Sequence, residues 1–284
     1  MVILLALAAA ALYGSGDFIG GVASRAAHVL TVLMLSTPAG AVVVIIAALA
    51  TGGPVRVAGL AWGAAAGAIG GIGLMIFFTG LAKGPMNVIA PVTGLVSTVV
   101  PVGAALAGGE RPGAPVYAGA ALCLVAIVLA SSAGGGPASA APGRLGTVRA
   151  LAYAVASGGS FGLFFLFIRN GGQSGALWPV VAARLAELAV VLFAVAVVRP
   201  GALSRGNSTP LLLAAVGSGA IDAIANVCYV AATRAGLFGL AVVLTSLYPG
   251  VTVLLARIVL GERLRWVQRT GLALAALGVV LVAA

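Results

Sequence analysis

Long apolar runs follow one another along almost the entire chain, separated by short breaks that contain Arg, Pro and Gly. A helix that crosses a bilayer needs about 20 mostly apolar residues. Runs of about this length occupy residues 2–22, 29–51, 58–80, 86–107, 115–132, 148–168, 176–198, 210–232, 237–259 and 266–283. Because the breaks are too short to hold a water-soluble domain, the pattern predicts an all-α integral membrane protein with ten transmembrane helices.

The longest break divides these runs into two halves of five. It covers residues 133–147 and reads AGGGPASAAPGRLGT, a composition that is typical of a linker. We therefore expect a first five-helix repeat in residues 1–132 and a second in residues 148–284. Ordered matches support the repeat: Gly109-Glu110-Arg111 recurs 152 positions later as Gly261-Glu262-Arg263, Gly84 matches Gly236 and Gly119 matches Gly271 at the same shift, and Gly14 matches Gly158 and Arg25 matches Arg169 at a shift of 144.

An odd number of spans in each half gives the two halves opposite orientations in the membrane. Inverted repeats that hold a site near the bilayer centre are an architecture of secondary transporters. Two equivalent halves with opposite orientations can exchange conformations and so open one site to each side in turn. The organisation of the chain therefore predicts two inverted five-helix repeats and favours a transporter of a small-molecule substrate.

The composition agrees with a lipid bilayer as the surrounding medium. Of the 284 residues, 62% are hydrophobic and 7% are charged, whereas soluble domains carry about 25% charged residues. The net charge of +10 comes from basic residues that mostly stand singly or in pairs between the apolar runs. This distribution is typical of membrane-protein loops and unlike a nucleic-acid-binding patch. The apolar start of the chain is interpreted as part of the first span and not as a removed signal peptide.

The sequence contains no pattern that indicates a cofactor, a metal site or ATP hydrolysis. Cys123 and Cys228 lie inside apolar runs, where small buried fillers are expected rather than a disulfide or metal ligands. A P-loop with its Lys and Ser or Thr is missing. The frequent glycines instead favour close helix packing, as in the small-residue ridge of Gly59, Gly63, Gly67 and Gly71.

A continuous polar stripe runs along the span at residues 210–232. It consists of Ser218, Asp222, Asn226, Tyr229 and Thr233, which share one face at helical spacing. Hydrogen bonding between helices would explain the stripe, and so would the wall of a substrate cavity in which Asp222 anchors the substrate. The corresponding positions of the first half are nonpolar, so the two halves are chemically unequal, as a substrate site requires.

Two further stripes carry candidate substrate contacts. Tyr13 and Asp17 share a face of the first span, where Asp17 either faces the cavity or lies hydrated near the membrane surface. Thr245 and Tyr248 share a face of the ninth span. The predicted substrate-binding set is therefore Asp222, Asn226, Tyr229, Tyr248, Thr245, Asp17 and Tyr13.

Ionisable residues inside a bilayer are costly, so they are candidates for function. Arg184 and Glu187 share a face of the seventh span, either as a structural ion pair or as substrate contacts. Three carboxylates face one arginine within the spans, and an unpaired carboxylate in a low dielectric tends to bind a proton. Asp222, Glu187 and Asp17 are therefore hypothesised to couple proton flow to transport, with a passive facilitator as the alternative.

Structural roles are expected for two glutamates and two prolines. Glu110 and Glu262 each precede an arginine where a span ends, and we expect local ion pairs there rather than a gate. Pro91 and Pro249 remove backbone donors within spans and free carbonyl groups. They are expected either to kink their helices for packing or to act as hinges.

The last two spans of each half carry motifs of a known transporter family. The first half reads APVTGLVSTVVPVGAALAGGERPGAPVYAGAALCLVAIVLA and the second reads LTSLYPGVTVLLARIVLGERLRWVQRTGLALAALGVVLV. Each has a proline-bearing span, a Gly-Glu-Arg and a closing span with an internal glycine. The chain resembles, over its whole length, the EamA-type, ten-helix branch of the drug/metabolite transporter superfamily.

This resemblance implies a multi-pass protein of the inner (cytoplasmic) membrane that moves amino acids or other metabolites by alternating access. Members that it resembles are exporters, and the family includes some importers. It also implies a cavity lined partly by helices 1, 4, 6, 8 and 9, and cytoplasmic termini. The basic residues are more numerous after spans 1, 3, 5, 7 and 9, which by the positive-inside rule would place both termini outside. Orientation, substrate, direction of transport, coupling ion and oligomeric state stay open.

Two other classes of function are weighed against transport. One is a receptor or structural role, and the other is an intramembrane hydrolase, because Gly158-Gly159-Ser160-Phe161-Gly162 matches the G-x-S-x-G motif. That motif requires a strand-to-helix turn and a histidine partner. Ser160 lies within an apolar run and the single histidine, His28, lies at the edge of a loop. We therefore expect a transporter and not an enzyme.

Overall fold

The computed structural model describes residues 1–84, 86–109, 113–131, 146–172, 177–197, 208–260 and 266–283. In these ranges the regular secondary structure is helical, without a strand, which confirms the all-α prediction for this part of the chain. The helices are α1 (Val2–Ala26), α2 (Val29–Thr51), α3 (Val57–Lys83), α4 (Met86–Ala107), α5 (Ala114–Ser131), α6 (Thr147–Gly171), α7 (Trp178–Val197), α8 (Thr209–Ala235), α9 (Phe238–Thr245), α10 (Tyr248–Leu260) and α11 (Trp266–Ala283).

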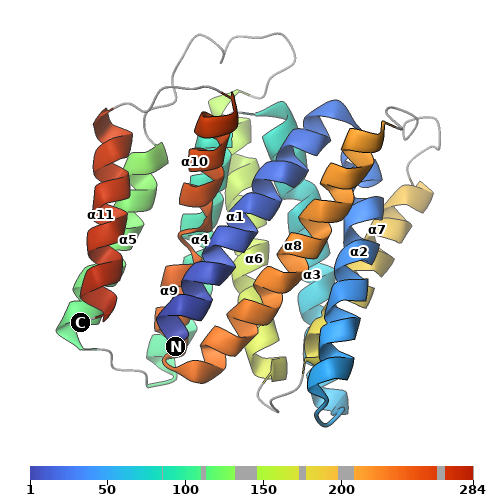
Figure 1. Ribbon diagram of the computed structural model, residues 1–284, viewed down its shortest axis with the longest axis horizontal. Helices are drawn as coiled ribbons and strands as arrows, with labels where there is room; N and C mark the ends of the chain where they lie inside the picture. Colours follow the sequence, from blue (N-terminus) through green and yellow to red (C-terminus); the bar gives the residue numbers. More distant parts are fainter. Residues whose placement is uncertain are drawn as a thin grey trace.

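The helices form one bundle, and α1 begins at the same end of this bundle at which α11 ends (Figure 1). Within the described residues, 7 helical stretches are long and apolar enough to cross a membrane, and Val92–Ala107 is a shorter apolar helix. Large apolar side chains such as Ile46, Phe193 and Leu213 are exposed on the outside of the bundle, where lipid solvates them. The chain is therefore a multi-pass membrane protein, and the count of ten spans stays a prediction.

The observed helices follow the predicted spans closely except in the ninth, which is interrupted. α9 ends at Thr245 and α10 begins at Tyr248, with a turn at Ser246 and Leu247 between them. Pro249 lies in the first turn of α10 and has no N–H to donate to the carbonyl of Thr245, four positions earlier. The interruption therefore lies where the sequence predicts a loss of helical hydrogen bonding. In contrast, α4 is continuous through Pro91.

The first helices of the two halves run in opposite directions. The ends of α1 and α3 lie side by side, because Arg25 Nε donates to the carbonyl of Leu81 at 3.3 Å. The end of α3 lies beside the start of α6, since a Cβ placed on Gly80 would be 3.3 Å from Tyr153 Cβ. α1 and α3 are thus parallel and α6 is antiparallel to both, as expected for inverted repeats.

Packing between the halves repeats when the halves are exchanged. α1 packs along α8 and α6 packs along α3, α2 packs on α8 and α7 packs on α3, and α5 and α11 pack against each other (Figure 1). Gly14 of α1 lies against the carbonyl of Tyr248 and, three residues further on, a valine Cβ. Gly158 of α6 lies against the carbonyl of Thr93 and likewise a valine Cβ three residues on. Because the sequence aligns Gly14 with Gly158, equivalent residues make equivalent contacts.

The glycine ridge of α3 allows α7 to approach very closely. A Cβ on Gly67 would collide with the backbone carbonyl of Ala183, and one on Gly71 would lie 3.3 Å from Glu187 Cα. Small residues permit such contact between helix backbones, which favours helix association in membranes. Since Ala183 and Glu187 flank Arg184 on α7, the ridge fixes the position of the helix segment that carries the central charges.

Candidate functional site

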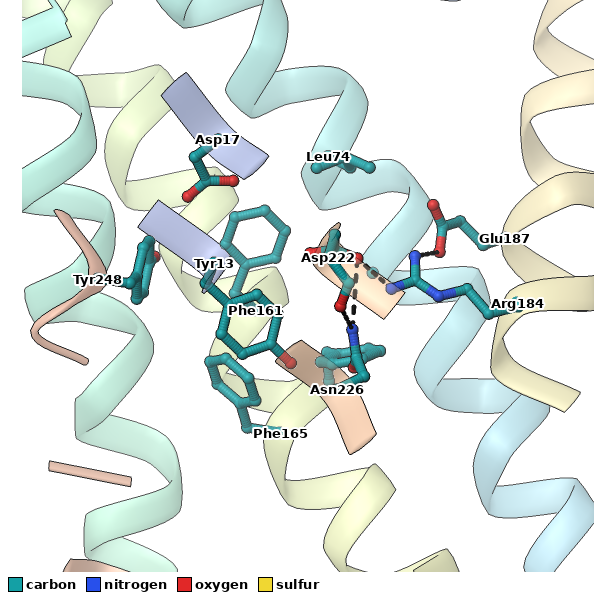
Figure 2. Close-up of a pocket in the computed structure, with 12 residues that line it drawn as sticks. Tyr13, Asp17, Leu74, Phe161, Phe165, Arg184, Glu187, Asp222, Asn226 and Tyr248 are labelled. Atoms are coloured by element: carbon teal, nitrogen blue, oxygen red, sulfur yellow. Dashed lines mark hydrogen bonds and ion pairs between the residues drawn. The ribbon is translucent and has the colours of Figure 1, made fainter. Parts of the chain in front are cut away.

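A cavity lies in the middle of the bundle between helices of both halves (Figure 2). Its empty space, open mouth included, is about 490 Å³. The lining side chains come from α1 (Tyr13, Asp17), α3 (Gly70, Leu74), α6 (Phe161, Phe164, Phe165), α7 (Arg184, Glu187), α8 (Asp222, Asn226) and α10 (Tyr248). Spans 1, 6, 8 and 9 thus contribute as expected, α3 and α7 contribute as well, and span 4 supplies none of the described lining residues.

The most polar part of the wall is a cluster of charges around Arg184. Its Nη1 donates to Glu187 Oε2 at 2.8 Å, and its Nη2 pairs with Asp222 Oδ2. Thr37 of α2 donates to Glu187 Oε1 at 3.2 Å. Buried charges are tolerated when they are paired and hydrogen-bonded. The Arg184–Glu187 pair expected from the spacing therefore exists, and Asp222 and Thr37 extend it into a link among α7, α8 and α2.

Asp222 is the most accessible member of this charge cluster. Its side chain is 26% exposed, whereas those of Arg184 and Glu187 are 6% and 7% exposed. Asn226 Nδ2 donates to the Asp222 carbonyl at 2.8 Å and lies 3.3 Å from Asp222 Oδ2. Asn226 Oδ1 is buried and has no hydrogen-bond partner in the described part of the chain. Buried polar atoms usually have a partner, so this acceptor is an unsatisfied polar atom of a residue that lines the cavity.

Asp17 lies across the cavity from Arg184 (Figure 2). Its residue is 8% exposed, so it belongs to the cavity wall and not to the hydrated membrane surface. Over the described ranges, no hydrogen bond or ion pair reaches its carboxylate. One turn earlier, the hydroxyl of Tyr13 is also buried without a partner from these ranges. The two residues therefore present unused polar groups to the cavity.

Aromatic rings form much of the wall beside Asp17. The ring of Tyr13 meets Phe165 edge-on with a centroid distance of 5.9 Å and Tyr248 at 6.2 Å. Phe161 packs edge-on against Phe77 of α3 at 5.6 Å. Such contacts are favourable for aromatic pairs and hold each ring in one orientation. The cavity therefore combines an aromatic side with a charged side.

A smaller space of about 290 Å³ extends the site toward α2. It shares Asp17, Arg184 and Asp222 with the larger cavity and adds Thr37 of α2 and Ser218 of α8. Of the predicted polar stripe, Ser218 and Asp222 thus line this smaller space, and Asp222 and Asn226 line the larger cavity.

Two of the predicted contact residues are buried and are not among the described lining residues. Tyr229 is fully buried, packs on Phe165 at 4.7 Å between ring centroids and donates from its hydroxyl to the Phe165 carbonyl at 3.4 Å. Thr245 is buried at the end of α9, beside the interruption. Glu110, Glu262 and the side chain of Pro91 lie outside the described residues.

Several relevant residues were not singled out from the sequence. Phe161, Phe164 and Phe165 share one face of α6 at helical spacing, a signal that could have identified them. Thr37 carries no such signal, because its role depends on the packing of α2 against α7. Arg257, inside the ninth predicted span, is also buried, so the count of one arginine within the spans was too low.

In the described part of the chain, the side-chain hydrogen bonds of the two hydrolase candidates are local. Ser160 Oγ donates to the carbonyl of Ala156 at 3.0 Å within α6. His28 caps the start of α2, where its Nδ1 accepts from the backbone N–H of Leu30 at 3.3 Å. This geometry differs from a nucleophile elbow with a histidine base. In the residues that the structure describes, no group of three or more His, Cys, Asp or Glu side chains is placed to hold a metal ion.

Comparison with known proteins gives a family and a fold. The EamA-like transporter family matches the chain twice, over residues 1–132 and residues 148–284. A crystal structure described only as that of a protein superposes with a TM-score of 0.70, covering 99% of this chain and 95% of the other at 22% sequence identity. It is one of 18 chains of known structure that match, and at this identity the likeness shows the fold alone. No curated protein matches the sequence significantly.

Proposed function

Because this chain belongs to the EamA-like transporter family, we propose that it is a secondary transporter that moves a small metabolite across the cytoplasmic membrane by alternating access, with export as its direction. The solute is amino-acid-like or amphipathic. The proposal includes ten spans, with α9 and α10 counted as one, in two inverted repeats of residues 1–132 and 148–284 joined by residues 133–147.

The observation that carries this proposal is a central cavity whose wall is shared by the two halves. Tyr13 and Asp17 come from the first half, and Asp222, Asn226 and Tyr248 come from the second. A movement of one half against the other therefore changes the contacts of any bound solute, which is the requirement for opening one site to each side in turn. These five residues are the proposed direct contacts, and Tyr229 and Thr245 act by supporting them.

The proposed hinge is the interruption between α9 and α10, with Pro91 as a second flexible point in the first half. Pro249→Ala supplies the missing N–H and favours one continuous helix. We expect slower transport by this variant at unchanged thermal stability. An unchanged transport rate would remove the interruption from the mechanism.

The proposed coupling groups are Asp222, Glu187 and Asp17, which line one cavity and carry more negative charge than Arg184 neutralises. If a proton exchanges with the solute at these carboxylates, the transport rate depends on the pH difference across the membrane. Asp222→Asn is expected to weaken that dependence. Full pH dependence in this variant would count against Asp222.

Flux in proteoliposomes tests the function directly. Metabolites that raise the melting temperature of the purified protein are selected first, because a ligand stabilises the state it binds. At least one of them is expected to show saturable counterflow that protein-free liposomes lack. Ser160→Ala should transport normally, since its hydroxyl bonds only to its own helix. Stabilising ligands without any counterflow would favour a receptor role.

A further inference from the structure

The charge balance of the cavity restricts the class of solute that it can bind. Among the described lining residues, three carboxylates face one guanidinium group. The two terminal nitrogens of Arg184 are already paired, one with Glu187 and the other with Asp222. A carboxylate on a solute would therefore compete with two internal carboxylates for the single positive charge of Arg184.

Asp17 differs from the other two carboxylates because no cationic side chain among the described residues pairs with it. It is more than nine-tenths buried, and no hydrogen bond or ion pair from those residues reaches it. Its carboxylate points into the cavity on the side opposite Arg184 (Figure 2). A buried carboxylate without a partner either binds a proton or pairs with a cation, so a positive group inside the cavity can take the place of that proton at Asp17.

The surroundings of Asp17 suit an organic cation better than a hydrated metal ion. Tyr13 and Tyr248 line the cavity with it, and their ring centroids lie 6.2 Å apart. Phe161 and Leu74 add apolar surface. The faces of aromatic rings attract ammonium groups, including quaternary ones, and the apolar surface accommodates a hydrophobic body.

On the premise that the protein is a transporter, we propose that its solute is an amphipathic monocation, an aryl or alkyl ammonium compound. Its nitrogen pairs with Asp17, and its apolar body lies against Tyr13, Tyr248 and Phe161. Arg184 keeps its ion pairs with Glu187 and Asp222 while the solute binds. A zwitterionic amino acid therefore binds more weakly than a cation of similar size.

Three probes of similar size and different charge test the wild-type protein. Benzyltrimethylammonium is a permanent cation, phenylacetate is an anion and L-phenylalanine is a zwitterion. In detergent, we expect saturable thermal stabilisation by benzyltrimethylammonium, at least tenfold weaker binding of L-phenylalanine, and no binding of phenylacetate. Tighter binding of either carboxylate-bearing probe than of the cation would overturn the proposal.

Three variants of α1 localise the interaction. Asp17→Asn removes the charge with little change of shape and should weaken benzyltrimethylammonium binding at least tenfold, whereas Asp17→Glu should restore most of it. Ser15→Ala is the matched control, because the Ser15 hydroxyl bonds to the Ala11 carbonyl of the same helix at 2.7 Å. Equal affinity of Asp17→Asn and wild type would refute the assignment, and the wild-type probe series decides independently if that variant does not fold.

Counterflow of the same probes separates this inference from the proposed function. Cation binding that depends on Asp17 but produces no flux would refute transport and leave the binding assignment standing. Counterflow of L-phenylalanine without benzyltrimethylammonium binding would keep the transporter and refute the monocation. Counterflow of benzyltrimethylammonium that Asp17→Asn loses would support both.

Discussion

Arg184 holds two carboxylates at once, and the loss of each partner has a different consequence. Without Asp222, Arg184 still pairs with Glu187 at 2.8 Å. Without Arg184, the two carboxylates would face each other in a low dielectric with no cation between them. The arginine is therefore the member of this cluster on which the ion-pair link between α7 and α8 depends most.

Arg184→Met should consequently destabilise the protein more than Asp222→Asn does. Removal of Arg184, the partner that both carboxylates share, leaves buried charges unpaired and should lower the free energy of unfolding by about 3–5 kcal/mol. Loss of one charged hydrogen bond at the partly exposed Asp222 should lower it by about 1–3 kcal/mol. Thermal unfolding in detergent gives the order of the two variants. Equal melting temperatures would mean that Arg184 is not shared.

Because charged side chains are costly inside a bilayer, the sequence alone was enough to select Asp17, Arg184, Glu187 and Asp222 as candidates. Their partners were only partly predictable. Arg184 and Glu187 lie three residues apart on one helix, so their pairing follows from helix geometry. The pairing of Arg184 with Asp222, 38 residues away, depends on how α7 and α8 are placed by the helices that each packs on, α2 among them, and no local pattern encodes that placement.

Contacts between helix backbones determine the position of the site at the scale of elements. α7 lies against the glycines of α3, and α2 lies against Gly219 of α8, where a Cβ would collide with the carbonyl of Ser36. Side chains of ordinary size would keep these helices apart and widen the cavity. The glycines of α3 and α8 therefore determine where the charged residues of the cavity lie.

Gly67→Ala should separate α3 from α7 and move Arg184. Overpacking of this kind costs about 1–3 kcal/mol, and we expect a lower melting temperature together with weaker solute binding. Gly103→Ala of α4 is the matched control, because nothing lies within 4 Å of its added Cβ and alanine favours a helix over glycine by about 0.5–1 kcal/mol. Equal effects of the two substitutions would contradict the close contact.

The boundaries of the helices were largely predictable because apolar length and breaking residues are local properties. Most predicted spans agree with the observed helices within a few residues at each end, as α2 and α4 illustrate. The sequence did not predict that the helix would be interrupted at Ser246 and Leu247. Pro249 indicated a disturbance, but a kink and a full interruption have the same sequence signal and differ in tertiary packing.

Two features of the whole molecule agree with an even number of membrane crossings. α1 begins and α11 ends at one end of the bundle (Figure 1), and the first helices of the halves are antiparallel. The sequence predicted this inversion from the five apolar runs in each half. It could not give the orientation of the whole, because basic residues occur in loops at both ends.

Tags at the two termini should therefore be accessible from the same side of the membrane. Sealed right-side-out and inside-out vesicles, treated with a protease, would show cleavage of both tags in one preparation and of neither in the other. The preparation that is cleaved also decides between cytoplasmic and external termini. Cleavage of one tag in each preparation would require an odd number of spans.

The exchanged packing of the halves also bears on how the protein is assembled in the cell. The most extensive contacts of α1, α3 and α5 are with α8, α6 and α11, which are all synthesised later. At a synthesis rate of about 5–20 residues per second, the early helices wait on the order of ten seconds for these neighbours. During that interval α1, which carries Asp17, lacks its main neighbour α8. We therefore expect the nascent first half to depend on the insertion machinery or a membrane chaperone until the second half is inserted.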